Sequence, residues 1–171
     1  MRVIFDTSAF IPKNKPDDEK DAILELTKLL PSLDITICVS RKIIKEYGSK
    51  LRLFPSKFRF QEFFKDVLAK ARTQKSCRSI PFGNLRIHRI EPKVNLDDDL
   101  RGKIEDRCGE YDLEDEKFLE LFIYVGRSKD IFLVTVAEDL ACMAEEAKRL
   151  LGLDGQIISS VRSFLEVLSL D

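Results

Sequence analysis

The chain has 171 residues, of which 44% are hydrophobic and 35% charged, with only 7 Gly and 6 Pro; this excludes a disordered chain and is typical of one helix-rich globular domain. The net charge of −1 hides an asymmetry, because residues 41–89 carry 14 basic and 3 acidic groups, for +11, and residues 90–171 carry 10 basic and 20 acidic groups, for −10. This asymmetry indicates a polyanionic partner or a cation site, unless the two segments neutralise each other across one fold.

In the first half of the chain, short apolar or β-branched runs alternate with apolar residues at helical spacing. The runs predict strands and the spacing predicts helices. In chain order we expect a strand at 3–5, a helix at 17–30 ended by Pro31, a strand at 35–39, a helix that begins after Ser40 and stops before Pro55, and a helix at 58–75. Ser40 is a suitable N-cap for the helix that follows it.

The second half continues the same alternation. We expect a loop at 78–84 around Pro81 and Gly83, a strand at 85–90, helices at 97–108 and 114–125, a strand at 131–135, a helix at 139–150 ended by Gly152, a strand at 156–159 and a helix at 161–168. Strands that alternate with helices predict a parallel sheet with helices on both faces. We therefore expect one α/β domain over residues 1–171, with a central parallel sheet of four to five strands.

Cysteine spacing and the apolar pattern set further expectations. Cys38, Cys77, Cys108 and Cys142 are widely spaced, no CxxC pair occurs and His88 is the only histidine, which argues against a structural zinc site. We expect buried or half-buried apolar cysteines, although the thermophile-like scarcity of Asn and Gln leaves a disulfide open. No apolar run of about 18 residues and no signal peptide occur, so we expect a cytoplasmic protein with no membrane contact.

Five acidic residues fall where such a sheet binds ligands, beyond the carboxyl ends of its strands. Asp6 directly follows the first strand, and Asp139 lies just past the strand at 131–135. Glu46 lies on the helix after the second strand, and Asp112 and Asp115 begin the helix that leads into the fourth. Clustered carboxylates repel one another, and a hard divalent cation such as Mg²⁺ or Mn²⁺ compensates them. Such a cation can activate water and stabilise a phosphoryl transition state.

Each acid also has a purely structural interpretation. Asp6 and Asp139 could cap helices, and Asp112 and Asp115 could stabilise a helix N-terminus through its dipole. Glu46 has lysines four residues before and after it, as on an ordinary solvated helix face. The position of Asp6 at a strand end, and the convergence of all five acids on one edge, favour a site.

Two segments carry a resemblance to a known family. Residues 3–8, Val-Ile-Phe-Asp-Thr-Ser, resemble the opening strand of PIN domains, which ends in Asp-Thr-Ser or Asp-Thr-Asn. Residues 112–119, Asp-Leu-Glu-Asp-Glu-Lys-Phe-Leu, resemble the Asp-x-x-Asp-Glu-x-Phe-Leu segment of prokaryotic, toxin-like PIN proteins. The positions of Glu46 and of residues 133–135 also fit, so the resemblance covers nearly the whole chain. It implies an endoribonuclease dependent on Mg²⁺ or Mn²⁺, with Asp6, Glu46 and Asp115 as core acids and a toxin of a toxin-antitoxin pair as one possible role.

One position departs from the family. PIN domains continue Leu-Val-Thr-x-Asp-x-Asp-Leu after the fourth strand, and here Ala137 replaces the first acid while Asp139 keeps the second. We expect Asp139 to serve as the fourth catalytic acid, helped by Glu138 or Asp112, with activity that depends on Mn²⁺ or on elevated Mg²⁺.

The expected roles at this site are as follows. Asp6 and Asp115 would bind metal directly, Glu46 would bind metal or its waters, and Asp112 and Asp139 would complete the metal set. The hydroxyls of Thr7, Ser8 and Thr135 would orient water or the scissile phosphate, with turn or helix capping as the equal alternative.

The basic segment supplies candidate RNA contacts, because Lys and Arg side chains provide most of the non-specific affinity for phosphate backbones. The seven candidates are Arg41, Lys42, Lys45, Lys50, Arg52, Lys57 and Arg59. Phe54, Phe58 and Phe60 are candidates for base stacking, although packing in the core is the preferred interpretation. In toxin-like relatives this pair of helices also contributes to dimer or antitoxin contacts, so a homodimer and a protein antitoxin are expected partners beside RNA.

Other functions fit less well. The strongest rival is a catalytically weakened PIN-like module that binds RNA or protein, which Ala137 favours and the retained acids oppose. A flap-type DNA nuclease needs DNA-clamping elements for which the chain is too short. A phospho-aspartate hydrolase requires an acid at Ser8, and a nucleotide site requires a Gly-rich loop, which is absent.

Overall fold

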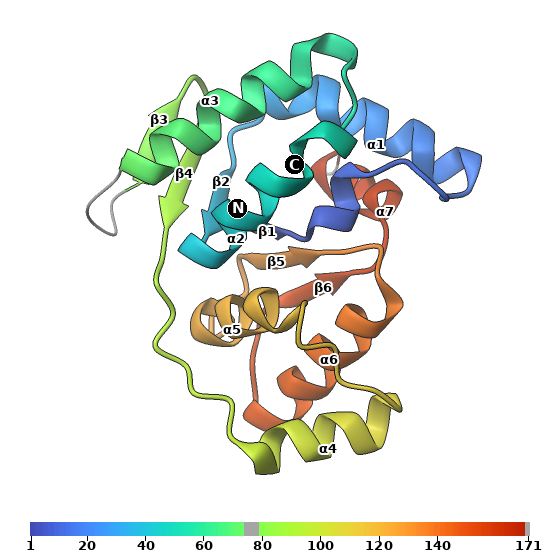
Figure 1. Cartoon of the computed structure of the whole chain (residues 1–171), viewed down its shortest axis with the longest axis vertical. Coiled ribbons are helices and arrows are strands. Elements are labelled where there is room, and N and C mark those ends of the chain that lie inside the picture. The colour runs from blue at the N-terminus through green and yellow to red at the C-terminus, as the bar shows by residue number, and fades with distance from the viewer. Residues whose placement is uncertain (74–78, 170–171) are drawn as a thin grey trace.

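One sheet organises the part of the chain described by the computed structural model, residues 1–73 and 79–169 (Figure 1). Its strands are β1 (Arg2–Phe5), β2 (Thr36–Val39), β3 (Ser79–Phe82), β4 (Leu85–Arg89), β5 (Ile131–Val134) and β6 (Gln156–Ile158). The strand order is β3-β4-β2-β1-β5-β6. Every pairing is parallel except that of β3 with β4. The expected α/β architecture is confirmed, with β1 at the centre of the sheet.

Helices cover the sheet on both sides. They are α1 (Asp17–Leu29), α2 (Arg41–Lys50), α3 (Phe60–Thr73), α4 (Asp98–Cys108), α5 (Glu116–Val125), α6 (Glu138–Leu151) and α7 (Val161–Leu168). Short 3₁₀ turns are η1 (Thr7–Phe10), η2 (Leu30–Ser32), η3 (Leu51–Leu53) and η4 (Lys57–Arg59). Figure 1 shows α1, α3 and α7 on one side of the sheet and α4, α5 and α6 on the other. Within the described residues, no helix is both long and apolar enough to cross a membrane.

The burial of the strands in the core explains why their sequences are unbroken apolar runs. All four residues of β5 are buried, as are Val3, Ile4 and Phe5 of β1, because helices cover both faces of the sheet. An aromatic cluster then joins the turn after β1 to α2 and α3. Its members are Phe10, Tyr47, Phe54, Phe60 and Phe64. The preference for packing over base stacking is thus confirmed for Phe54 and Phe60, whereas Phe58 is 57% exposed.

The expectation of a loop at 78–84 was wrong for the part of it that is described. Ser79–Phe82 forms β3, an antiparallel edge strand on β4. Among the described residues the sheet has five parallel strands, as the sequence predicts, and β3 is a sixth strand added to them. Phe82 pairs with Leu85, which leaves Gly83 and Asn84 as a two-residue hairpin turn, and Gly83 has φ +66° as such turns require. Pro81 is tolerated because an edge strand needs hydrogen-bond donors on only one side. Arg78 lies outside the described residues.

Two further expectations needed correction. The helix expected at 58–75 begins at Phe60, because Phe58 and Arg59 have positive φ values of 57° and 56°, which no α-helix accommodates. A disulfide joins Cys108 at the end of α4 to Cys142 on α6, with Cα atoms 5.9 Å apart, so these two cysteines are not free apolar residues. Cys38 is free and buried, as expected, and Cys77 lies outside the described residues.

Candidate metal centre

The centre is built on the carboxyl ends of β1 and β5. Phe5 pairs with Val134, so Asp6 and Thr135 follow side by side where the two strands end. The Asp6 amide donates to the Val134 carbonyl at 2.8 Å, and the Thr135 hydroxyl donates to Asp6 Oδ2 at 2.9 Å. The Ser8 hydroxyl donates to the same Asp6 oxygen, and the Val136 amide donates to Ser8 Oγ at 2.9 Å. Asp6 is only 3% exposed and is held firmly in place.

Helix α2 is tied to the same strand end. The Ser40 hydroxyl caps α2 by accepting from the Ile43 amide at 3.2 Å, as the sequence predicted. The buried Tyr47 hydroxyl donates to the carbonyl of Phe5, the last residue of β1. This contact places Glu46, the preceding residue, against the turn after β1, where the Thr7 hydroxyl donates to Glu46 Oε1.

Three half-buried carboxylates meet beside Asp6. Asp112, Asp115 and Asp139 each offer an oxygen atom within 4.8 Å of the other two, and we refer to them as the acidic cluster. Asp112 and Asp115 lie between α4 and α5, and Asp139 lies in the first turn of α6. The Glu114 amide donates to Asp112 Oδ1 at 2.6 Å, and the Leu140 amide donates to Asp139 Oδ1 at 2.9 Å. The expectation that these acids converge is therefore met.

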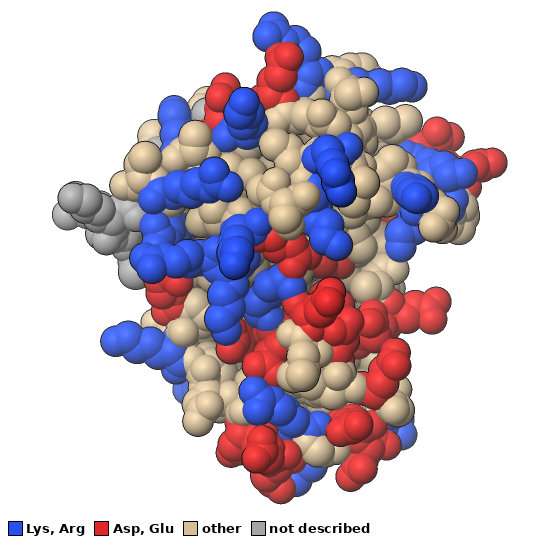
Figure 2. Space-filling model, in the orientation of Figure 1, with Lys and Arg blue, Asp and Glu red and all other residues tan. Residues whose placement is uncertain are grey.

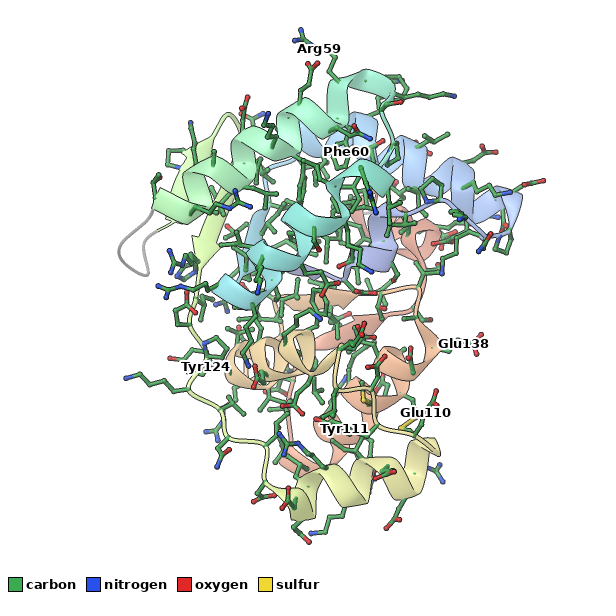
Figure 3. The ribbon with its side chains drawn as sticks, in the orientation of Figure 1. Arg59, Phe60, Glu110, Tyr111, Tyr124 and Glu138 are labelled. Atoms are coloured by element: carbon green, nitrogen blue, oxygen red, sulfur yellow. A yellow bond between two sulfur atoms is a disulfide. The ribbon has the colours of Figure 1, made fainter. Side chains whose placement is uncertain are left out.

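The segment that carries Asp112 and Asp115 is anchored at both ends. The Cys108–Cys142 disulfide, the yellow bond in Figure 3, holds its start against α6. At the start of α5, Arg101 binds the Glu116 carboxylate through two nitrogen atoms at 2.9 and 3.0 Å, and the Tyr111 hydroxyl donates to it at 3.0 Å. Glu116 is thus engaged in structure and is no candidate for metal.

The electrostatic surroundings of Asp115 disfavour its charged form. Burial raises the pKa of Asp115 to about 7, and the negative charges of Asp6, Asp112 and Asp139 add to this, while Lys117 opposes it. Burial also raises the pKa of Asp6, against the lowering effect of the Ser8 and Thr135 hydroxyls. The negative charge of Asp115 is therefore not fully compensated by its surroundings.

The donor set fits a hard cation. Carboxylate oxygens without sulfur or imidazole are the ligands that Mg²⁺ and Mn²⁺ prefer. Two oxygen ligands on opposite sides of one Mg²⁺ lie about 4.2 Å apart, so carboxylate oxygens within 4.8 Å of one another need only a small approach, or bridging water, to share an ion. The acidic cluster can hold a metal ion.

A pocket of about 320 Å³ lies over these groups. Its lining includes the acids Asp6, Glu46 and Asp115, the hydroxyl residues Thr7 and Ser8, the lysines Lys13, Lys15, Lys50 and Lys117, and Ala137. Lys15 also donates to the Val136 carbonyl at 3.3 Å. Ala137, where the motif that the sequence resembles has an acid, lies in the wall of this pocket. The side chain of the neighbouring Glu138 points outward into solvent and does not take that place (Figure 3).

Glu46 is not part of the acidic cluster. Its Oε2 forms an ion pair with Lys117 on α5, and its Oε1 accepts from Thr7. Sequence reasoning overlooked Lys117, because it fills an unspecified position of the resembling motif and its spacing to Glu46 gives no signal. Lys13 and Lys15 were overlooked for the same reason.

The seven candidate RNA contacts are all exposed. Figure 2 shows Lys and Arg side chains gathered over α2 and α3, meeting the acidic lower half of the molecule near its middle. Next to the acid pocket lies a groove of about 260 Å³, the lysine groove, lined by Lys42, Lys45, Ser49, Lys50 and Lys117 together with Glu46. The other candidates, Arg41, Arg52, Lys57 and Arg59, are not part of its lining.

The site thus joins a carboxylate centre that can hold a cation to a groove that can hold an anion. Thr7, Ser8 and Thr135 are all at the centre, and each donates to a carboxylate. The Thr135 hydroxyl also accepts from the Ala137 amide at 3.0 Å, at the start of α6, so it combines both expected roles. A scan of family models gives no match for this chain, and a search of curated proteins gives none either. The geometry of the site is therefore what supports a function.

Proposed function

We propose that the chain is a metal-dependent endoribonuclease of the PIN-domain type, acting in the cytoplasm. One observation carries the proposal: Asp115, a member of the acidic cluster, lines a pocket together with Asp6 and Glu46, and this pocket lies beside the lysine groove. Phosphodiester hydrolysis needs these two features side by side, a cation at the reacting phosphate and basic side chains along the backbone. The preference for RNA, a toxin role, an antitoxin and a homodimer rest on the resemblance to PIN domains.

Each group has a role in this proposal. Asp112, Asp115 and Asp139 would hold the metal ion, with Asp6 beside it, and a bound Mg²⁺ or Mn²⁺ would supply activated water and positive charge for the phosphate. Ser8 and Thr135 keep Asp6 in one orientation. Lys45 and Lys50 would bind backbone phosphates on either side of the scissile bond.

The proposal is tested with end-labelled single-stranded RNA incubated in EDTA, Mg²⁺ or Mn²⁺. We expect cleavage that needs metal and that falls at least about 100-fold in Asp6→Asn and Asp115→Asn, as for loss of a group that stabilises transition-state charge. Asp106→Asn, an exposed acid on α4, is the matched control and keeps full activity. A DNA oligonucleotide of the same sequence tests the preference for RNA. Cleavage that persists in EDTA would refute a metal-dependent mechanism.

A second candidate is a binding module without catalysis. Ala137 in the pocket wall and the Glu46–Lys117 ion pair favour it, because two acid positions of the family pattern are then not available to metal. RNA that is bound but stays intact in every metal, together with no heat of Mn²⁺ binding, would select this function over the nuclease.

A further inference from the structure

Lys117 lies at the junction of the two parts of the site. It lines both the acid pocket and the lysine groove. Its side chain is only 14% exposed, and Glu46, its partner, is 18% exposed. Four acids and five other lysines line these two cavities, and the low exposure of Lys117 indicates that the fold, rather than a chance pairing in solvent, places its ammonium group among them.

Three contacts hold the ammonium group of Lys117 in place. It forms the ion pair with Glu46 Oε2, donates to the Glu114 carbonyl, and lies 5.0 Å from the ring centroid of Phe118. The other Glu46 oxygen is already occupied by the Thr7 hydroxyl. Glu46 is therefore already paired with a cation, and a metal ion would have to compete with Lys117 for this carboxylate.

Among the described residues, the acids do not form two equivalent groups of metal ligands. Two-metal hydrolases hold their ions about 3.5–4 Å apart and share carboxylates between them. Here Asp112, Asp115 and Asp139 form one ligand group, and Glu46, which lines the same pocket as Asp6 and Asp115, is a further acid that a second ion could use. Lys117 already supplies a positive charge next to Glu46.

We propose that Lys117 is a built-in second cation, so that the site binds one divalent metal ion at the acidic cluster and the Lys117 ammonium group takes the place of another. This inference rests on the proposed function for the identity of the anion, a phosphodiester, which would contact the metal on one side and Lys117 on the other. Arginine or lysine at such a position stabilises the charge of a transferring phosphoryl group without a second ion.

The number of Mn²⁺ ions per chain tests the inference, measured by calorimetry and by electron paramagnetic resonance on the full chain. We expect one ion for the native chain and for Lys117→Arg, which keeps the charge. Lys117→Met keeps the apolar stem but removes the charge, and we expect it to bind two ions, the second more weakly. Adding Glu46→Gln to Lys117→Met should return the count to one, because the second ion then loses its ligand.

Controls separate this inference from the proposed function. Lys129→Met, on the exposed loop before β5 at the opposite edge of the sheet, should keep one ion and full cleavage. Circular dichroism melts establish that each variant folds. Two ions on the native chain, one ion on Lys117→Met, or none on either would overturn the inference. A count that changes from one to two in a chain that cleaves no RNA would refute the nuclease and leave the assignment of Lys117 standing.

Discussion

Replacing Asp115 by Asn should stabilise the metal-free protein. Burial and three neighbouring negative charges raise the pKa of Asp115 from its usual 3.8 to about 7 in the folded chain. The folded state therefore holds a proton that the unfolded state releases between about pH 4 and pH 7. As pH rises through that window, the free energy of unfolding falls, and above pH 7 it levels off. Asn has nearly the same shape as Asp and no charge, so the free energy of unfolding of the variant does not fall in this way as pH rises.

The magnitude follows from the shift. About three pKa units correspond to a ceiling near 4 kcal/mol, at about 1.36 kcal/mol per unit. Asp115 is half-buried and partly screened by solvent, which reduces the expected gain to about 1–2 kcal/mol at pH 8. For a chain of this size, that gain raises the melting temperature by about 2–8 °C.

Urea denaturation in EDTA at pH 5 and pH 8 measures the effect. The stability difference between Asp115→Asn and the native chain should grow from pH 5 to pH 8, whereas Asp106→Asn should differ little from native at either pH. With Mn²⁺ at about 100 times its dissociation constant, the native chain should gain about 2.7 kcal/mol and the Asn variant far less. Equal or lower stability of Asp115→Asn at pH 8 in EDTA would refute the reasoning, because the acidic cluster would then carry no uncompensated charge.

Three other changes have definite outcomes. Tyr47→Phe removes a buried hydroxyl that donates to the last carbonyl of β1, so urea denaturation should show a loss of about 1–2 kcal/mol, and unchanged stability would contradict that contact. The double variant Cys108→Ser/Cys142→Ser opens a bridge across 34 residues and should lose about 3–4 kcal/mol, as should the native chain in dithiothreitol; equal melting with and without reductant would argue against the bridge. Lys45→Gln/Lys50→Gln should weaken RNA binding in EDTA and reduce the slope of log affinity against log salt by about 1.4, measured by fluorescence anisotropy; an unchanged slope would exclude phosphate contacts by these two lysines of the lysine groove.

The architecture could be predicted because its cause is local. Strands that are buried on both faces have unbroken apolar sequences, and amphipathic helices have apolar residues three or four positions apart. The order of strands and helices and most of their boundaries can therefore be predicted from the sequence. The hairpin of β3 and β4 is not predicted, because Pro81 and Gly83 by themselves favour a loop. Gly83-Asn84 is in fact a recognised two-residue hairpin signal.

The site was predictable only in part, for a physical reason. Residues that follow parallel strands must share an edge, so the approach of Asp6 and Thr135, and of Asp139 beside them, was foreseeable. The orientation of Glu46 and its ion pair with Lys117 depend on how α2 packs against α5. No local sequence pattern encodes that packing. The disulfide depends in the same way on the packing of α4 against α6.

The Cys108–Cys142 bridge closes a covalent ring that contains all three carboxylates of the acidic cluster. Leu113, between the first two of them, is 71% exposed and is the natural place for a protease to cut. In the oxidised chain such a cut leaves Asp112 linked through the bridge to the fragment that carries Asp115 and Asp139. In the reduced chain the same cut leaves no covalent link between them. A single nick therefore has different consequences in oxidising and reducing surroundings, and only the oxidised chain keeps every ligand of the centre on one molecule.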